Sequence, residues 1–316
     1  MWGFLLRRLG HAALVLLVVS TVTFAIVHAA PGGPSLLADP KLSVAEREAI
    51  ESRLGLDQPI PVQYARWLSR LVRGDLGNSF LFESSNVSTI RSRLPNTLLL
   101  AGTALMLTML VAIPLGAWSA ERPGGWIDRV CNAFAFVAMS VPTFWLGIVL
   151  VLVFAVHWQL LPAGGASTVG VAGSVSDRLR HLTLPALVLA TVGTAELFRY
   201  TRASARGVFG LAFVRTARAK GVSERGVRWR HGMRNALLPI VTVVGLQLPR
   251  LVGGAAITET VFSWPGMGRL GIEAALARDY PLVMAITLLV SAGVLVCSLL
   301  VDLAYFALDP RAHPDR

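Results

Sequence analysis

Long apolar runs separated by polar segments dominate the pattern of this chain. Crossing a bilayer takes about 20 mostly apolar residues, and six runs reach that length. Because lipid offers the backbone no hydrogen-bond partner, each run is expected to be a helix. The runs are Leu9–Ala29, Thr97–Trp118, Cys131–Val156, Leu182–Ala203, Ala236–Thr258 and Leu282–Phe306. The pattern therefore predicts an all-α integral membrane protein with six transmembrane helices.

Prolines interrupt several of these runs. A proline inside a helix removes one backbone hydrogen bond and clashes with the preceding turn. We therefore expect kinks, or breaks that line a cavity, where prolines lie within or near the ends of a run. These residues are Pro114, Pro142, Pro185 and Pro249.

The first run has two interpretations. Arg7 and Arg8 give it a basic start, and Val27-His28-Ala29 resembles a signal-peptide cleavage site. However, the run is longer than the signal-peptide core of about 7–15 residues. This length favours a retained helix, and either interpretation places the N-terminus inside.

The basic residues predict the orientation, because cytoplasmic loops are enriched in Lys and Arg. The segment from 31 to 95 carries eight basic and seven acidic residues, and segments of that length translocate largely regardless of charge. The basic residues on the predicted inner side are Arg7, Arg8, Arg122, Arg129, the cations of Arg199–Arg234, Arg311 and Arg316. The two shorter outer loops hold Arg178, Arg180, Arg269 and Arg278. Both termini are therefore expected in the cytoplasm.

The long outer segment is expected to contain two short helices. Ser43 followed three residues later by Glu46 forms a capping box, and Gly55 is a suitable C-terminal stop. The second helix has apolar positions at helical spacing. These positions are Tyr64, Trp67, Leu68 and Leu71. The segment could shield the outer mouth of a pathway or form a docking surface for an extracytoplasmic partner.

Composition supports a membrane protein and argues against other classes. The chain is 54% hydrophobic and has a net charge of +11, above the apolar fraction typical of soluble domains. Its arginines lie beside apolar runs, which is typical of orientation in a bilayer rather than of nucleic-acid binding. Cys131 and Cys297 are far apart in sequence and form no metal-binding or disulfide pattern.

Motifs for catalysis are missing from the sequence. It contains no GxxxxGK[ST] phosphate loop, so we expect no ATP hydrolysis by this chain. It also contains no HExxH and no GxSxG motif. The six histidines include no pair with metal-ligand spacing on one helix face. A transport role without bound metal or cofactor is therefore favoured over an enzyme.

The most polar segment between apolar runs is Arg215–Pro239. From Arg199 to Arg234 there are ten Lys or Arg residues and one acid, Glu224. A helix is expected over 207–220, with Gly221 as its stop and Ser223 as the cap of a second helix. The segment could bind a cytoplasmic partner, or it could only set orientation and touch anionic lipid.

The first of these helices has the chemistry of a docking element. Small side chains let another surface approach closely, and surrounding cations supply complementary charge. The small residues are Thr216, Ala217 and Ala219, and the cations are Arg215, Arg218 and Lys220. A helix of this kind could fit a groove on a cytoplasmic partner.

The segments RTARAKG and RHGMRNALLP resemble the cytoplasmic loop of permease subunits from dipeptide, oligopeptide and nickel ABC importers. In the wider superfamily this loop opens Glu-Ala-Ala, with a glycine four residues on; here Arg215-Thr216-Ala217 and Gly221 occupy those positions. The missing Glu is typical of the peptide branch. Further similar segments are APGGP, LGLDQP, RGDLGNSF, SVPTFWLGI, LLPAGG, TRAS, ITETVFSWPGMGRL, ARDYP and VDLAYFALDP. The resemblance thus covers nearly the whole chain.

Three positions depart from the family pattern. Gly33 stands where an Asp is usual, and Leu211-Ala212-Phe213 replaces an acidic-aromatic lead-in to the loop. Pro249-Arg250 interrupts the fifth run, where small or apolar residues are usual. The replacement at Leu211-Ala212-Phe213 concerns details of the expected contact with the ATPase subunit.

The resemblance implies a type I ABC importer permease in the inner membrane of a prokaryote. It implies a partner permease that is homologous, two cytoplasmic ATPase subunits that bind ATP and Mg²⁺, and an extracytoplasmic binding protein. The expected division is a first helix at 1–30, an outer cap at 31–96, a core at 97–308 with its coupling loop at 204–235, and a tail at 309–316. The implied coupling residues are Arg215, Thr216, Ala217, Arg218, Ala219, Lys220, Gly221, His231, Arg234 and Asn235.

Two ionisable residues inside predicted spans are candidates for the translocation pathway, because burying a charge in a membrane is unfavourable. Arg250 could meet a substrate carboxylate, with Glu196 opposite it. Alternatively, Glu196 pairs locally with Arg199 or Tyr200, and Arg250 has a structural role.

The resemblance predicts peptide import, and it leaves open nickel or another small solute such as glutathione. A secondary transporter that works without ATPase subunits is the alternative from another class.

Overall fold

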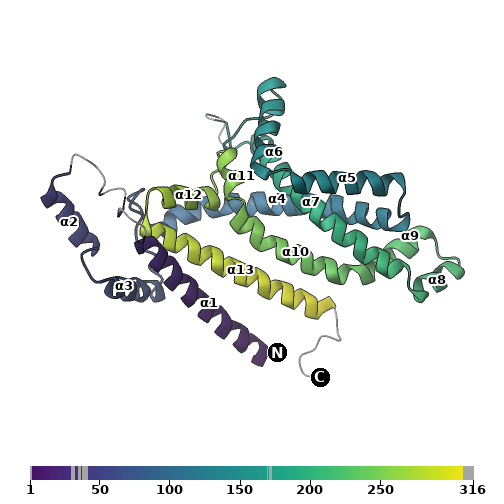
Figure 1. Cartoon of the computed structure of the whole chain (residues 1–316), viewed down its shortest axis with the longest axis horizontal. Helices are drawn as coiled ribbons and strands as arrows, with labels where there is room; N and C mark the ends of the chain where they lie inside the picture. The colour runs from purple at the N-terminus through teal and green to yellow at the C-terminus, as the bar shows by residue number, and fades with distance from the viewer. Residues whose placement is uncertain are drawn as a thin grey trace. The chain divides into compact units, whose positions relative to one another are not determined.

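The computed structural model describes residues 2–29, 33–34, 37, 42–168, 170 and 173–308. In these ranges the chain is helical and has no strand, apart from one isolated bridge between Asn78 and Ser85. The helices up to the middle of the chain are α1 (Trp2–Ala29), α2 (Val44–Leu54), α3 (Ile60–Val72), α4 (Asn86–Glu121), α5 (Trp126–Ser140), α6 (Thr143–Leu150) and the π-helix η2 (Val151–His157). They are followed by α7 (Val175–Phe209), α8 (Ala212–Ala219), α9 (Glu224–Gly226), the π-helix η3 (Val227–Met233), α10 (Arg234–Gly254), α11 (Ala256–Val261), α12 (Met267–Leu276) and α13 (Tyr280–Leu308). The all-α class is confirmed (Figure 1).

Four described helices are long and apolar enough to cross a membrane, and they match four predicted runs. They are Leu6–Ala29, Asn86–Glu121, Val175–Phe209 and Tyr280–Ala304. Helices α4 and α7 continue through Pro114 and Pro185 without interruption.

The third predicted run is broken. Its two halves, Trp126–Ser140 and Thr143–His157, are bent by 102° at the break. Pro142 is the N-cap of the second half, and the residue before a proline is driven out of helical backbone geometry. Val141 accordingly has an extended backbone, with ψ 124°. The break expected at Pro142 is therefore confirmed.

The fifth predicted run, Ala236–Thr258, is also divided in the structure. Helix α10 ends at Gly254 and α11 begins at Ala256, and only Pro239–Pro249 forms a shorter apolar segment. Counting the bent pair as one span gives up to five candidate spans among the described residues. The total of six spans and the N-in, C-in orientation stay predictions.

The chain forms two compact units. The first comprises Met1–Thr97 and Pro265–Leu295, and the second comprises Leu98–Trp264 and Val296–Arg316. The start of α4 and most of α13 therefore fold with the segment that precedes α4, whereas the basic loop belongs to the second unit.

In the first unit, α3 packs against α1 through the face that its sequence predicts. The Tyr64 hydroxyl lies 2.9 Å from both the Ser20 and the Thr21 hydroxyls, and the Tyr64 ring meets Phe24 edge-on. The Gln63 amide oxygen lies 3.2 Å from Nε2 of His28. These contacts hold α3 across α1 (Figure 1).

The predicted caps of α2 are confirmed. Ser43 accepts a hydrogen bond from the Glu46 backbone N–H, and the Glu46 carboxylate accepts from the Ser43 backbone N–H at 2.8 Å. The hydrogen bonds from Ser43 lower the pKa of Glu46, because they stabilise the ionised carboxylate. Gly55 ends the helix in the left-handed conformation, with φ 69°.

Asp279 joins the start of α13 to the outer segment. Its buried carboxylate accepts hydrogen bonds from the Ser79 hydroxyl at 2.5 Å, the Leu81 N–H at 2.9 Å and the Leu282 N–H at 3.1 Å. The same carboxylate thus caps a helix and orders residues that lie 200 positions away in sequence.

Asp279→Ala is expected to lower the free energy of unfolding by about 2 kcal/mol, because three donors lose their acceptor. Thermal unfolding of the purified chain in detergent measures this loss. The control is Asp57→Ala, since Asp57 is exposed and, within the part of the chain that the structure describes, accepts only from the neighbouring Gln58 side chain. Equal melting temperatures for the two variants would contradict the assignment.

In the second unit, the core brings α4, α5, α7 and α10 together. Its buried residues are largely small, and a glycine or alanine at a helix crossing allows close approach of the backbones. A Cβ on Gly193 of α7 would lie 2.8 Å from Oγ1 of Thr108. A Cβ on Gly116 of α4 would lie 2.7 Å from the Thr201 side chain. The buried core residues include Ala112, Ala117, Ala135, Ala195, Leu197, Phe198, Met233, Ala236 and Ile240.

Candidate functional site

The basic loop between α7 and α10 folds into three short pieces. Helix α7 runs to Phe209, and α8 begins at Ala212 after a break. The prediction of one helix over 207–220 is therefore wrong at its start, because residues 207–209 continue the preceding helix. Its end is confirmed: Lys220 is the C-cap, and Gly221 has the left-handed φ of 76°.

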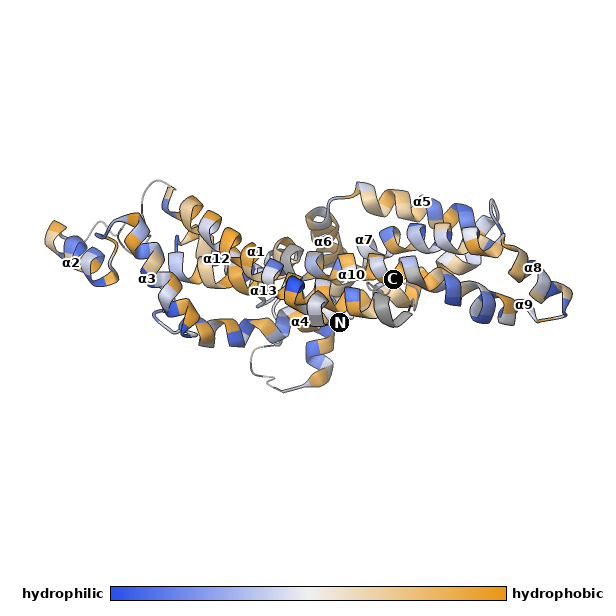
Figure 2. Ribbon diagram, turned by 90° about the horizontal axis from the view of Figure 1, so that it is seen from below, coloured by the Kyte–Doolittle hydropathy of each residue, from blue (hydrophilic) through white to orange (hydrophobic). Residues whose placement is uncertain are grey.

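Ser223 caps the next helical segment, as predicted. Its hydroxyl accepts a hydrogen bond from the Gly226 N–H at 3.3 Å. Helix α9 then passes directly into η3 and α10, so the chain stays helical from Glu224 into the apolar run. In Figure 1, α8 and α9 lie beyond the end of α7, and Figure 2 shows hydrophilic residues on α9.

Helix α8 has one buried face and one exposed face. Val214 and Ala217 are buried, and they pack with Val227 of η3 and with Val208 and Val222. The expectation that Ala217 presents its small side chain to a partner is wrong, because the chain itself covers this residue. Ala217 lies on the face of α8 that packs against Val227 of η3.

The exposed face of α8 carries five of the other predicted coupling residues. Arg218 pairs with Glu224 through two contacts of 3.1 and 3.3 Å. Arg215 donates to the Gly210 carbonyl at 3.2 Å. Both contacts join α8 to its own loop and leave a fixed cationic surface. We call this surface the α8 face; its members are Arg215, Thr216, Arg218, Ala219 and Lys220, all of them exposed.

The last three predicted coupling residues lie near the start of α10. Arg234 and Asn235 are exposed, and His231 is half-buried. The Asn235 amide donates to the His231 carbonyl at 2.8 Å. This hydrogen bond lies within one continuous helical segment.

An ion pair that was not predicted from the sequence anchors the loop to α4. Arg228 of η3 donates from Nε and Nη2 to the two carboxylate oxygens of Glu121, the last residue of α4. Their side chains are only 20% and 16% exposed. The loop is therefore fixed at the end opposite to the α8 face.

A second anchor, Asp128, lies near the start of α5, just after the turn that follows α4. Asp128 accepts from Arg202 of α7 at 2.5 and 2.9 Å. It also accepts from the Ser119 hydroxyl at 2.5 Å and from the Gly124 N–H at 2.8 Å. The Asp128 side chain is 6% exposed, so its negative charge depends on these donors. The only signal in the sequence was Arg202 in the TRAS segment.

Together, these two ion pairs converge on the turn between α4 and α5. Glu121 holds the loop, and Asp128 holds the last part of α7 from which the loop starts. Charged side chains thus join the basic loop to α4 and the last part of α7 to α5.

The hypothesis that Glu196 lies opposite Arg250 stays a prediction. Glu196 is half-buried on α7, whereas the side chain of Arg250 lies outside the described residues. Arg199, proposed as a local partner of Glu196, donates to the Met139 sulfur at 3.5 Å. In the part of the chain that the structure describes, no group of three or more His, Cys, Asp or Glu residues could hold a metal ion.

Comparison with known proteins gives the family. The model for the binding-protein-dependent transport system inner membrane component matches residues 112–314, and the model for the N-terminal part of such a membrane component matches residues 1–101.

Named relatives extend this match over nearly the whole chain. The oligopeptide transport system permease protein AppB of Bacillus subtilis (strain 168) is 42% identical over 313 residues, which covers 98% of this chain and 99% of the relative. The dipeptide transport system permease protein DppB of Escherichia coli (strain K12) is 37% identical over 334 residues, with 98% of each chain covered.

A solved structure shares the fold. The inward-facing MetNI methionine ABC transporter matches with a TM-score of 0.54 and 18% identity, over 71% of this chain and 97% of that chain. The chain therefore belongs to the binding-protein-dependent transport system inner membrane components, and it is a permease component of an ABC importer.

Proposed function

We propose that this permease moves peptides into the cytoplasm by alternating access and is driven by separate ATPase subunits through the Arg215–Arg234 loop. The names of AppB and DppB support oligopeptides or dipeptides as the substrate class. A second, homologous permease and an extracytoplasmic binding protein complete the assembly. ATP and Mg²⁺ bind to the ATPase subunits, and this chain supplies the pathway and the coupling.

The observation that carries this proposal is the two-sided construction of α8. Its apolar side is packed inside the chain, while its exposed side gathers cations around Thr216 and Ala219. A pre-ordered surface loses little conformational entropy on binding, and fixed cations favour an acidic groove. The α8 face is therefore suited to bind an ATPase subunit.

The anchors explain how motion at the α8 face would reach the pathway. When the ATPase subunits close, the loop moves as a rigid piece because Val214 and Ala217 hold it to η3. The Glu121–Arg228 and Asp128–Arg202 pairs transfer the displacement to α4, α5 and α7. Glu196 and Arg250 remain candidates for contacting the substrate inside the pathway.

Reversing charge on the α8 face tests the coupling. We expect Arg215→Glu with Lys220→Glu to reduce ATPase co-purification and ATP-driven uptake about tenfold, which corresponds to about 1.4 kcal/mol of lost binding energy. Binding is measured by pull-down of the assembled complex, and uptake is measured in vesicles that contain the binding protein.

The matched control carries the same charge change outside the loop. Arg53→Glu with Arg91→Glu alters two exposed arginines of the outer segment and of the start of α4, and it should leave ATPase binding unchanged. Equal behaviour of the two double variants would reject the α8 face as the coupling surface. Uptake that persists without any ATPase subunit would indicate a secondary transporter instead.

Competition in the same vesicles tests the substrate class. Unlabelled di- and oligopeptides should displace a labelled peptide, whereas displacement only by nickel or by glutathione would reject general peptide import.

A further inference from the structure

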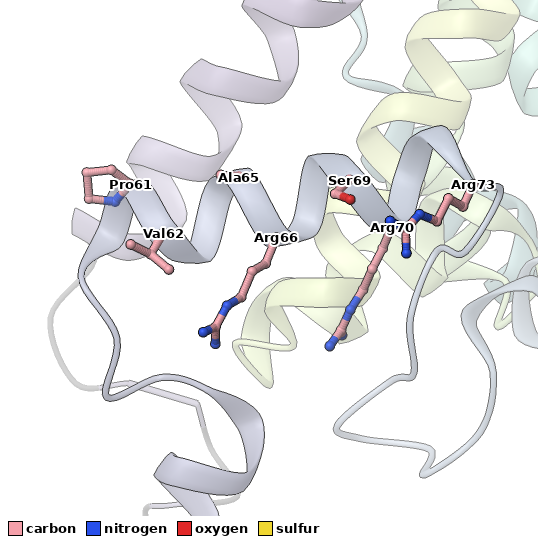
Figure 3. A pocket seen from close by; sticks show the side chains of 7 residues that line it. All are labelled: Pro61, Val62, Ala65, Arg66, Ser69, Arg70 and Arg73. Atoms are coloured by element: carbon pink, nitrogen blue, oxygen red, sulfur yellow. The ribbon is translucent and has the colours of Figure 1, made fainter.

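Helix α3 and its C-cap residue carry three arginines on one side. Arg66, Arg70 and Arg73 are exposed, and Figure 3 shows Arg66 and Arg70 extending from the same side of the helix. Among the described residues, none of the three takes part in an ion pair. They line an open hollow of about 570 Å³ together with Pro61, Val62, Ala65 and Ser69.

An apolar groove lies on the other side of α3, where it meets α1 and α13. The groove has a volume of about 410 Å³. Except for Ser20, its lining is entirely apolar. The residues that define it best are Leu16 and Leu17 of α1, Leu68 and Leu71 of α3, and Leu288 and Ala292 of α13.

The location of this groove limits what can fill it. Two of its walls, α1 and α13, are candidate membrane spans, with only 11% and 28% of their apolar windows buried within the chain. In a bilayer an open apolar groove on such helices is filled by an acyl chain or by another protein. The arginines distinguish these possibilities, because they add a cationic site on the same helix.

Helix geometry connects the two features. Successive residues of an α-helix point about 100° apart, so Arg70 lies a little over a quarter turn around α3 from Leu71, which lines the groove. The carboxylate nearest in sequence, Asp75, accepts the Gly77 N–H at 2.8 Å. Arginine binds phosphate through two parallel hydrogen bonds, and its aliphatic part can lie along apolar surface while its charge stays in the polar layer.

We propose that α3 and its groove form a binding site for an anionic phospholipid. The phosphate binds to Arg66, Arg70 and Arg73, and one acyl chain enters the groove at Leu71 between α1 and α13. Amphipathic helices with a basic face lie at the membrane interface in this way. The positive-inside rule does not account for these arginines, since it predicts basic residues on the cytoplasmic side.

The proposal is independent of peptide transport, so lipid binding is measured directly. The purified full-length chain is incubated with phosphatidylglycerol or phosphatidylcholine, and the retained lipid is counted by native mass spectrometry. We expect phosphatidylglycerol to be retained in preference. Changing all three residues to glutamine (Arg66→Gln, Arg70→Gln, Arg73→Gln) should reduce its retention roughly tenfold.

Two further variants separate the parts of the site. Arg53→Gln, Arg91→Gln and Arg93→Gln together remove the same charge elsewhere in the first unit and should leave retention unchanged. Ala292→Phe fills the groove without touching the arginines, and it should also reduce phosphatidylglycerol retention. Melting temperatures confirm that each variant is folded.

Two results would overturn the lipid site. The first is equal retention of the two lipids by the native chain and all variants. The second is unchanged lipid retention in the arginine variant together with lost association of the binding protein, which would identify the arginine side of α3 as a surface for an acidic protein.

Discussion

Arg202→Ala is expected to destabilise the chain by about 3–5 kcal/mol, because it leaves the nearly buried Asp128 carboxylate without its cation. Arg202 supplies two of the hydrogen bonds to Asp128, at 2.5 and 2.9 Å, and the remaining donors are Ser119, Gly124 and Asn132. These neutral donors cannot balance a full negative charge in a dry site. Thermal unfolding in detergent should therefore show a loss of well over five degrees.

The same substitution should uncouple transport from ATP hydrolysis in the molecules that still fold. The last part of α7 would no longer be tied to the α4–α5 turn, so motion of the loop would not reach α5. We expect the assembled complex to retain ATPase activity while peptide uptake in vesicles falls. The ratio of peptide transported to ATP hydrolysed measures this effect directly.

Arg206→Ala provides the matched control, since Arg206 lies one turn later on α7 and is exposed. Its stability and transport ratio should equal those of the native protein. Asp128→Asn combined with Arg202→Gln should recover part of the lost stability, because no buried charge remains unpaired. If Arg202→Ala matched Arg206→Ala in both measurements, the proposed anchor would have no role.

Gly232→Ala is the second substitution with a large expected effect. A Cβ at this buried position would lie 2.1 Å from Cε1 and 2.7 Å from Cδ1 of Phe209. The ring of Phe209 belongs to the last residue of α7 and packs against the core of the second unit. The new methyl group must therefore push η3 away from α7, at a cost of about 1–3 kcal/mol.

The displacement should also weaken coupling, because η3 carries both Arg228 and the packing surface of α8. We expect a lower melting temperature and reduced uptake at unchanged ATPase binding. Gly207→Ala is the control: nothing lies within 4 Å of a Cβ at this exposed helical position, so it should be neutral or slightly stabilising. Combining Gly232→Ala with Phe209→Leu should restore stability. If stability is not restored, the contact with the Phe209 ring is not the cause of the loss.

Much of the fold was predictable because local rules decide it. The capping box at Ser43 and Glu46, the stop at Gly221 and the cap at Ser223 all depend on residues within one helical turn. The break at Pro142 follows from the geometry of the proline ring. Each of these predictions agrees with the structure.

The errors in the prediction arose where packing between helices overrides a local pattern. A run of small and basic residues does not reveal which of its members face inwards. Ala217 is covered because η3 places Val227 against it, and α7 continues to Phe209 because that ring packs between α7 and Gly232. Both contacts join residues from different helices.

The sequence by itself determined the helical class, the apolar runs, the basic loop and the family resemblance, because hydrophobicity, turn chemistry and motifs are properties of neighbouring residues. Tertiary structure decided which charges meet. Glu121 and Arg228 are 107 positions apart, and Asp128 and Arg202 are 74 apart, so no periodicity connects them. Charged side chains are mostly solvated at protein surfaces, and only folding shows which of them are buried together and can transmit motion.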